Sequence, residues 1–85
     1  MAYTVIYQGA AESTLRKLPK EIQARIVRKV DQLARDPFPA GREKLGDATN
    51  LWRIRIGDYR VIYTVERKEL IVLVLKIGHR REVYR

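Results

Sequence analysis

The segment LWRIRIGDYRVIY, residues 51–63, decides the fold of this chain. Apolar and polar residues alternate on both sides of Gly57-Asp58, over residues 51–56 and 59–65, and this period of two is typical of β-strands. Two residues that include a glycine, between two such runs, predict a tight hairpin. The predicted pairing puts Ile56 opposite Tyr59 and Arg55 opposite Arg60, and then Ile54 opposite Val61 and Arg53 opposite Ile62.

Alternation assigns the side chains of this hairpin to two faces. One face is apolar enough to pack against helices and carries Trp52, Ile54, Ile56, Tyr59, Val61 and Tyr63. The other carries Arg53, Arg55 and Arg60, beside Ile62 and Thr64. A one-residue slip of the register would separate Arg55 from Arg60, so this grouping depends on the turn.

Three arginines on one face of a hairpin are unfavourable for folding, because like charges directly opposite each other on paired strands destabilise the pairing by roughly 0.2–1 kcal/mol. A bound anion would remove the repulsion, and the planar fork of a guanidinium group suits phosphate. The alternative is that the arginines only cover an exposed sheet face with their stems. The pairing of Arg55 with Arg60 favours the phosphate interpretation.

The rest of the chain predicts a single α+β domain spanning residues 1–85. The expected order is β-α-α-β-β-β, a mainly antiparallel sheet with two N-terminal helices packed on one face. Its other elements are a strand over residues 3–8, a helix over 9–18, a second helix from Pro19 to the prolines at 37 and 39, and an apolar strand over 70–75. An apolar stripe of Ile22, Ile26, Val30 and Leu33 marks the inner side of the second helix.

Charge is the first indication of function. The formal net charge is +8 over 85 residues, and the excess is greater in residues 51–85, with nine basic and four acidic residues. Such a charge attracts nucleic acid, an anionic membrane surface or an acidic protein. The chain has no cysteine, which excludes a disulfide framework and a thiolate nucleophile. It has neither a signal peptide pattern nor an apolar run of roughly 20 residues, so we expect a cytoplasmic protein with no membrane partner.

The C-terminal run over residues 76–85 adds further basic residues and the only histidine. We expect Lys76, His79 and Arg81 to contribute to RNA binding together with Arg53 and Arg55. A functional and a merely structural role for His79 both stay open. Tyr84 could pack its ring on the sheet, or offer a hydroxyl or a stacking surface to a nucleotide.

The hairpin segment, followed by VLVLKIGHRREVY over residues 72–84, resembles the RelE toxins of prokaryotic toxin–antitoxin systems. The resemblance extends to the first strand and to the helix break at residues 15–19, so it covers nearly the whole chain. It implies an endoribonuclease that enters the ribosomal A site and cuts the mRNA there by attack of a ribose 2′-hydroxyl. That reaction needs no metal or other cofactor. The resemblance also implies a cognate antitoxin, which we expect to block the basic face with an acidic or amphipathic segment.

Site residues carry over from the resemblance position by position. Arg60 and Arg80 would stabilise charge at the scissile phosphate, Arg53 and Arg55 would hold the substrate or rRNA backbone, and Tyr84 would orient or deprotonate the 2′-hydroxyl. Well-known members have lysines where Arg53 and Arg55 stand, and one of those lysines has been proposed as the base. Arginine keeps its proton in proteins, so the identity of the base stays open between Tyr84 and His79.

Three other functions compete with this interpretation. ParE-type toxins share the fold but poison DNA gyrase, and they lack the arginine–tyrosine constellation. A non-catalytic RNA-binding module is the second. Against it, the face with Trp52 and Tyr63 is needed for the core and does not form an aromatic RNA-stacking surface. The third is a degenerate toxin that only binds its antitoxin.

Overall fold

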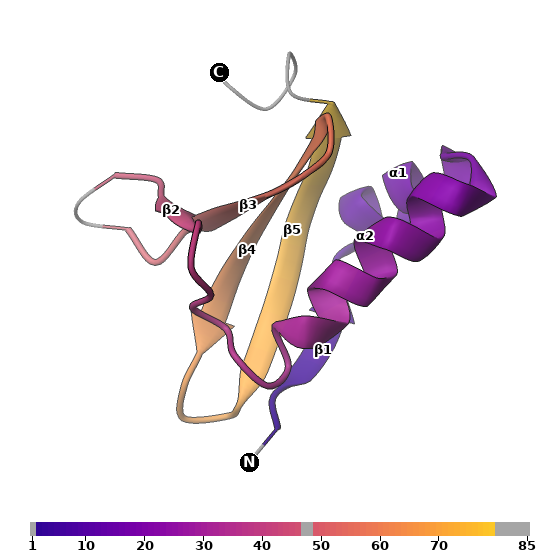
Figure 1. Ribbon diagram of the computed structural model, residues 1–85. Coiled ribbons are helices and arrows are strands. Elements are labelled where there is room, and N and C mark those ends of the chain that lie inside the picture. The colour runs from indigo at the N-terminus through magenta and orange to yellow at the C-terminus, as the bar shows by residue number, and fades with distance from the viewer. Residues whose placement is uncertain (1, 47–48, 80–85) are drawn as a thin grey trace.

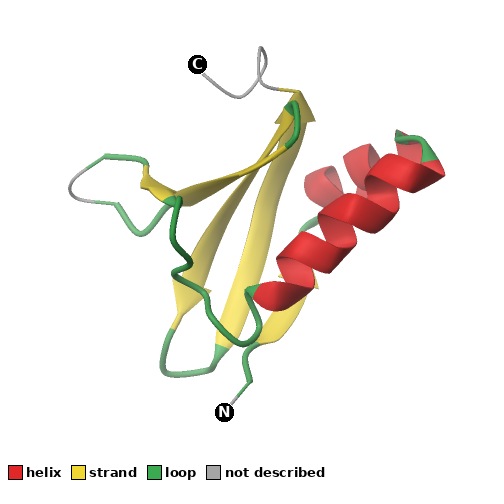
Figure 2. Ribbon diagram, in the orientation of Figure 1, coloured by secondary structure: helices red, strands yellow, loops and turns green. Residues whose placement is uncertain are grey.

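Residues 2–46 and 49–79, which the computed structural model describes, form two helices and five strands. In chain order the elements are β1 (Thr4–Tyr7), α1 (Gly9–Lys17), α2 (Lys20–Gln32), β2 (Glu43–Lys44), β3 (Trp52–Ile56), β4 (Tyr59–Glu66) and β5 (Ile71–His79) (Figure 1). The sheet order is β1-β5-β4-β3-β2, with β1 parallel to β5 and the other neighbours antiparallel. Both helices lie on one side of the sheet (Figure 2). The expected α+β fold is confirmed, with β2 as an additional short strand.

The β3–β4 hairpin has the predicted register, with Ile56 opposite Tyr59 and Arg55 opposite Arg60. Gly57 takes a φ of 60° at the first turn position. Two-residue hairpin turns need a positive φ there, which glycine adopts without steric cost. The turn therefore sets the register from which the two faces of the sheet follow.

The core lies between the helices and the helix-side face of the sheet. Ile26, Val30 and Leu33 of the predicted stripe are buried, and Ile22 packs beside them. They meet buried side chains from β3, β4 and β5, namely Ile54, Ile56, Val61, Tyr63, Val65, Val72, Val74 and Ile77. Trp52 and Tyr59 pack against this cluster, as predicted. No helix among the described residues is long and apolar enough to cross a bilayer.

A β-bulge in β5 changes which side chains face the helices. Ile62 pairs with Lys76 whereas Tyr63 pairs with Val74, so Leu75 is an extra residue between them. An extra residue reverses the alternation beyond it. Ile77 therefore joins Val74 on the core side, and Lys76 turns to the arginine side.

Two buried tyrosine hydroxyls allow a matched test of this packing. The Tyr63 hydroxyl donates a hydrogen bond of 2.7 Å to the Pro37 carbonyl and so ties β4 to the loop after α2. The buried hydroxyl of Tyr7 has no hydrogen-bond partner among the residues that the structure describes. Burial raises the pKa of Tyr63 to about 12; Arg42 opposes this shift and Asp36 adds to it.

We expect Tyr63→Phe to lower the free energy of unfolding by about 1 kcal/mol at neutral pH, because it removes a buried hydrogen bond. Tyr7→Phe should leave that free energy unchanged or raise it. In the folded protein the pKa of Tyr63 lies above the ordinary value of 10. The contribution of its hydroxyl to the free energy of unfolding is therefore complete below pH 10 and is lost as the pH rises toward 12. Urea unfolding at neutral and alkaline pH measures both effects. Equal losses in the two variants would contradict the assigned hydrogen bond.

Candidate functional site

Arg53, Arg55 and Arg60 lie together on the sheet face that turns away from the helices. Arg55 and Arg60 are directly opposite each other across β3 and β4, and Arg53 stands two residues before Arg55. Arg60 is only 2 % exposed, the Arg53 side chain is 12 % exposed, and Arg55 is exposed. The predicted face is therefore correct, but Arg60 is a buried cation and not part of an open surface.

Glu43 completes this cluster, and sequence reasoning missed it. Strand β2 pairs Glu43 with Arg53, and the Arg53 Nη2 atom lies 2.8 Å from the Glu43 Oε2 atom. The hydrogen bond and charge of Arg53, with smaller effects from Arg60 and Arg55, lower the pKa of Glu43. All three guanidinium charges thus act on one carboxylate. We call the four residues Glu43, Arg53, Arg55 and Arg60 the arginine cluster.

Strand β5 adds to the same face only in part. Lys76 pairs with Ile62, which pairs with Arg53, so the three form one row across the sheet. Gly78 pairs with Arg60 and brings no side chain to the face. His79 pairs with Tyr59, and its ring meets the Tyr59 ring edge-on at 5.6 Å between centroids. The structure therefore places Lys76 with the arginines and His79 on the helix side of the sheet.

The remaining candidates follow directly after β5. Arg80, Arg81 and Tyr84 lie outside the described residues, so their roles stay predictions. Within residues 2–46 and 49–79, no three side chains of histidine, cysteine, aspartate or glutamate gather in a way that could hold a metal ion.

The arginine cluster is chemically an anion-binding position. A carboxylate occupies it in this structure, and the cations around it present several N–H donors in rigid forks. Two of the three arginines are largely shielded from water, where a charge acts more strongly on an anion than it does in bulk solvent. Such an arrangement can bind a phosphate group and can stabilise additional negative charge that develops on it.

Known proteins similar to this chain share its fold and nearly its full length. The family described as the ParE toxin of the type II toxin–antitoxin system parDE matches residues 5–84. Toxin RelG of Mycobacterium tuberculosis is 31% identical over 86 residues, covering 100% of this chain and 99% of RelG.

Two solved structures agree with that assignment. The archaeal RelE–RelB complex from Pyrococcus horikoshii OT3 contains a chain 34% identical to this one, with a TM-score of 0.83 and coverage of 94% and 97% of the two chains. The toxin–antitoxin complex RelBE2 of Mycobacterium tuberculosis contains one 29% identical, with a TM-score of 0.82 and coverage of 94% and 100%. The chain therefore belongs to the ParE toxin family of type II toxin–antitoxin systems and has the RelE-like fold.

Proposed function

We propose that this toxin is an endoribonuclease that cuts mRNA in the ribosomal A site, in the cytoplasm, by attack of a ribose 2′-hydroxyl on the adjacent phosphate. The observation that carries this proposal is Arg60, a residue only 2 % exposed that lies opposite Arg55 in the arginine cluster. The names of the relatives, RelG and RelE toxins, support it.

Burial of Arg60 favours catalysis over a purely structural role. A buried charge adds little to the stability of a fold, because the cost of removing it from water offsets much of the favourable interaction energy with its partners. The same charge is effective toward an anion, because it is already oriented and has little water around it. The phosphorane formed by 2′-hydroxyl attack carries more negative charge than the starting diester, so the cluster would bind it more tightly than the substrate.

The division of roles follows from the exposure of the three arginines. Arg60 would stabilise the charge at the scissile phosphate, with Arg80 as its expected partner from beyond β5. Arg53 and Arg55 lie nearer to solvent and would hold the substrate or rRNA backbone. The carboxylate of Glu43 would leave Arg53 when a phosphate takes its place.

Proton transfer needs a different group, because arginines remain protonated. The His79 ring packs against Tyr59 on the helix side of the sheet and does not face the arginine cluster. That placement favours Tyr84 as the group that orients or deprotonates the 2′-hydroxyl. Its phenol has an ordinary pKa of about 10, so the surrounding arginines would need to stabilise the phenolate.

A cognate antitoxin is the second proposed partner, besides the ribosome with its mRNA. The similar solved structures are complexes of RelE with RelB and the RelBE2 pair. The ion pair between Glu43 and Arg53 shows that a carboxylate fits this position. An acidic antitoxin side chain could occupy it in the same way and exclude RNA.

Inhibition of DNA gyrase is the alternative function, because the matching family is described as the ParE toxin. A gyrase inhibitor of this fold has no need of a buried arginine cluster. The two activities leave different products, so one pair of assays separates them.

We expect Arg60→Gln to reduce cleavage of A-site codons by about 10²–10³-fold, the usual cost of removing one preorganised donor to a developing anion. Arg53→Gln should cause a smaller loss, and the exposed Arg35→Gln control should cut as the wild type does. The 5′ ends of mRNA in a translating extract report cleavage, and thermal unfolding verifies that each variant is folded. Undiminished cutting by a folded Arg60→Gln protein would contradict the role. Intact mRNA with blocked supercoiling by purified gyrase would support the alternative.

Removing the carboxylate should strengthen RNA binding. We expect Glu43→Gln to bind a single-stranded 2′-O-methyl RNA, which has no nucleophile and cannot be cut, several-fold more tightly than the wild type. The control is Glu12→Gln, which removes the same charge from an exposed ion pair with Arg16 on α1. Because the arginines lower the pKa of Glu43 from its ordinary value of 4.5, the difference should persist at pH 4.5 and disappear only at lower pH. Equal affinities of the two variants would show that Glu43 does not compete with RNA.

A further inference from the structure

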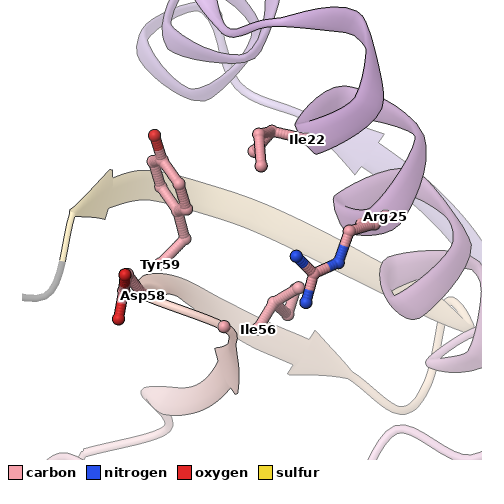
Figure 3. A pocket seen from close by; sticks show the side chains of 6 residues that line it. Ile22, Arg25, Ile56, Asp58 and Tyr59 are labelled. Atoms are coloured by element: carbon pink, nitrogen blue, oxygen red, sulfur yellow. The ribbon is translucent and has the colours of Figure 1, made fainter.

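A groove separates α2 from the tip of the β3–β4 hairpin and adjoins the arginine cluster at Arg55. Its basic part has a volume of about 250 Å³, and its lining residues are Arg25, Arg28, Lys29, Gln32, Arg55, Ile56 and Gly57. An adjoining part of about 170 Å³ is lined by Ile22, Arg25, Ile56, Gly57, Asp58 and Tyr59. Figure 3 shows the Arg25 guanidinium group reaching from α2 across this gap toward the hairpin.

Helix spacing brings three of the cations to the groove. Arg25, Arg28 and Lys29 stand at positions i, i+3 and i+4 of α2, which are neighbours on a helix surface. Like charges at these spacings disfavour the helix, and Glu21 at i−4 of Arg25 and Asp31 at i+3 of Arg28 offset part of that repulsion. The Arg25 side chain lies against the hairpin turn, because a Cβ atom added at Gly57 would lie 3.2 Å from the Arg25 Nη2 atom.

The fourth cation, Arg55, reaches the groove because β3 is the edge strand of the sheet at this position. Strand β2 pairs only with Trp52 and Arg53, so no neighbouring strand from the described residues covers β3 at Arg55. Its Nε atom donates to the Gly57 carbonyl at 3.4 Å, which directs the side chain along the turn toward α2. Arg55 therefore belongs both to the arginine cluster and to the groove.

Acidic groups offset these charges only in part within the described portion of the chain, since Glu43 pairs with Arg53 and acts on Arg55 at longer range. Neither Arg25, Arg28, Lys29 nor Arg55 forms an ion pair with another residue in the ranges 2–46 and 49–79, whereas Arg16 and Arg53 do. Among the residues that the structure describes, Asp58 is the one carboxylate that lines the adjoining part of the groove. The result is a concave site with three guanidinium groups, one ammonium group and an excess of positive charge.

We propose that this groove is a second phosphate-binding site, which holds the backbone of the RNA next to the point of cleavage. The inference rests on the proposed ribonuclease function and adds a binding track to it. Arg55 joins the groove to the arginine cluster, so one polynucleotide backbone can follow both around the edge of β3. An amphipathic helix of a protein partner would need an apolar groove, but Ile56 is the only large apolar side chain of the described residues that lines the basic part.

The test is a triple variant, Arg25→Gln, Arg28→Gln and Lys29→Gln, with fluorescence anisotropy of a labelled single-stranded 2′-O-methyl RNA at several salt concentrations. We expect the affinity to fall about tenfold or more. The slope of log Kd against log salt should decrease by about 0.7 for each phosphate that the protein no longer neutralises. In the translating extract, the variant should need a higher concentration for half-maximal cutting.

Two further proteins decide whether the effect belongs to the groove. A control triple, Lys17→Gln, Lys20→Gln and Arg35→Gln, removes the same charge from positions that line neither part of the groove, and it should keep the wild-type slope. The double variant Arg25→Lys and Arg28→Lys keeps the charge and should retain most of the slope. An unchanged slope in the groove variant, or an equal loss in the control triple, would overturn the proposal.

Two other results have distinct meanings. If the wild type prefers poly-L-glutamate to the RNA, and the groove variant loses only the poly-L-glutamate, the occupant is an acidic protein segment and the RNA site is refuted. If the wild type leaves mRNA intact in the extract while the groove variant still loses RNA affinity, the result supports RNA binding by the groove and contradicts the proposed ribonuclease function.

Discussion

The pairing of Arg55 with Arg60 across the β3–β4 hairpin is the constraint on which the remaining structure depends. Gly57 sets it, because its positive φ closes a two-residue turn. With this register, Ile54, Ile56 and Val61 enter the core and the arginines gather on the other face. A shift by one residue would exchange the two sets, so the same turn specifies both the core and the charged face.

The two faces of the sheet differ in chemistry: one is apolar and the other carries charged residues. The helix-side face buries aliphatic and aromatic side chains, and those contacts stabilise the fold. The other face holds Arg60, a cationic residue that is almost fully buried, and the burial of a charge carries a desolvation cost that the core must offset. The core thus supports β4, the strand that carries Arg60, and under the proposed ribonuclease function this support would orient the charge before a substrate binds. Such orientation is what makes a fixed charge useful in catalysis.

The sequence predicted the hairpin register, the α2 stripe and the face of each arginine, because regular alternation and a glycine turn leave few other arrangements. It did not predict Glu43, because a two-residue strand is too short for any period. Nor did it predict that His79 would pack with Tyr59, because the bulge at Leu75 reverses the alternation without a glycine or proline to mark it. The basic groove was also missed, since it depends on how closely α2 approaches the hairpin turn.

Membership in the ParE toxin family leaves two activities to distinguish, and the arginine cluster favours phosphodiester chemistry on RNA. The most direct measurement is the chemical nature of the ends left on mRNA in a translating extract. Attack by the 2′-hydroxyl, with Arg60 stabilising the phosphorane, predicts a 2′,3′-cyclic phosphate on the upstream fragment and a 5′-hydroxyl on the downstream one. Fragments with 5′-phosphate ends, or uncut mRNA accompanied by gyrase-linked DNA breaks, would contradict the account.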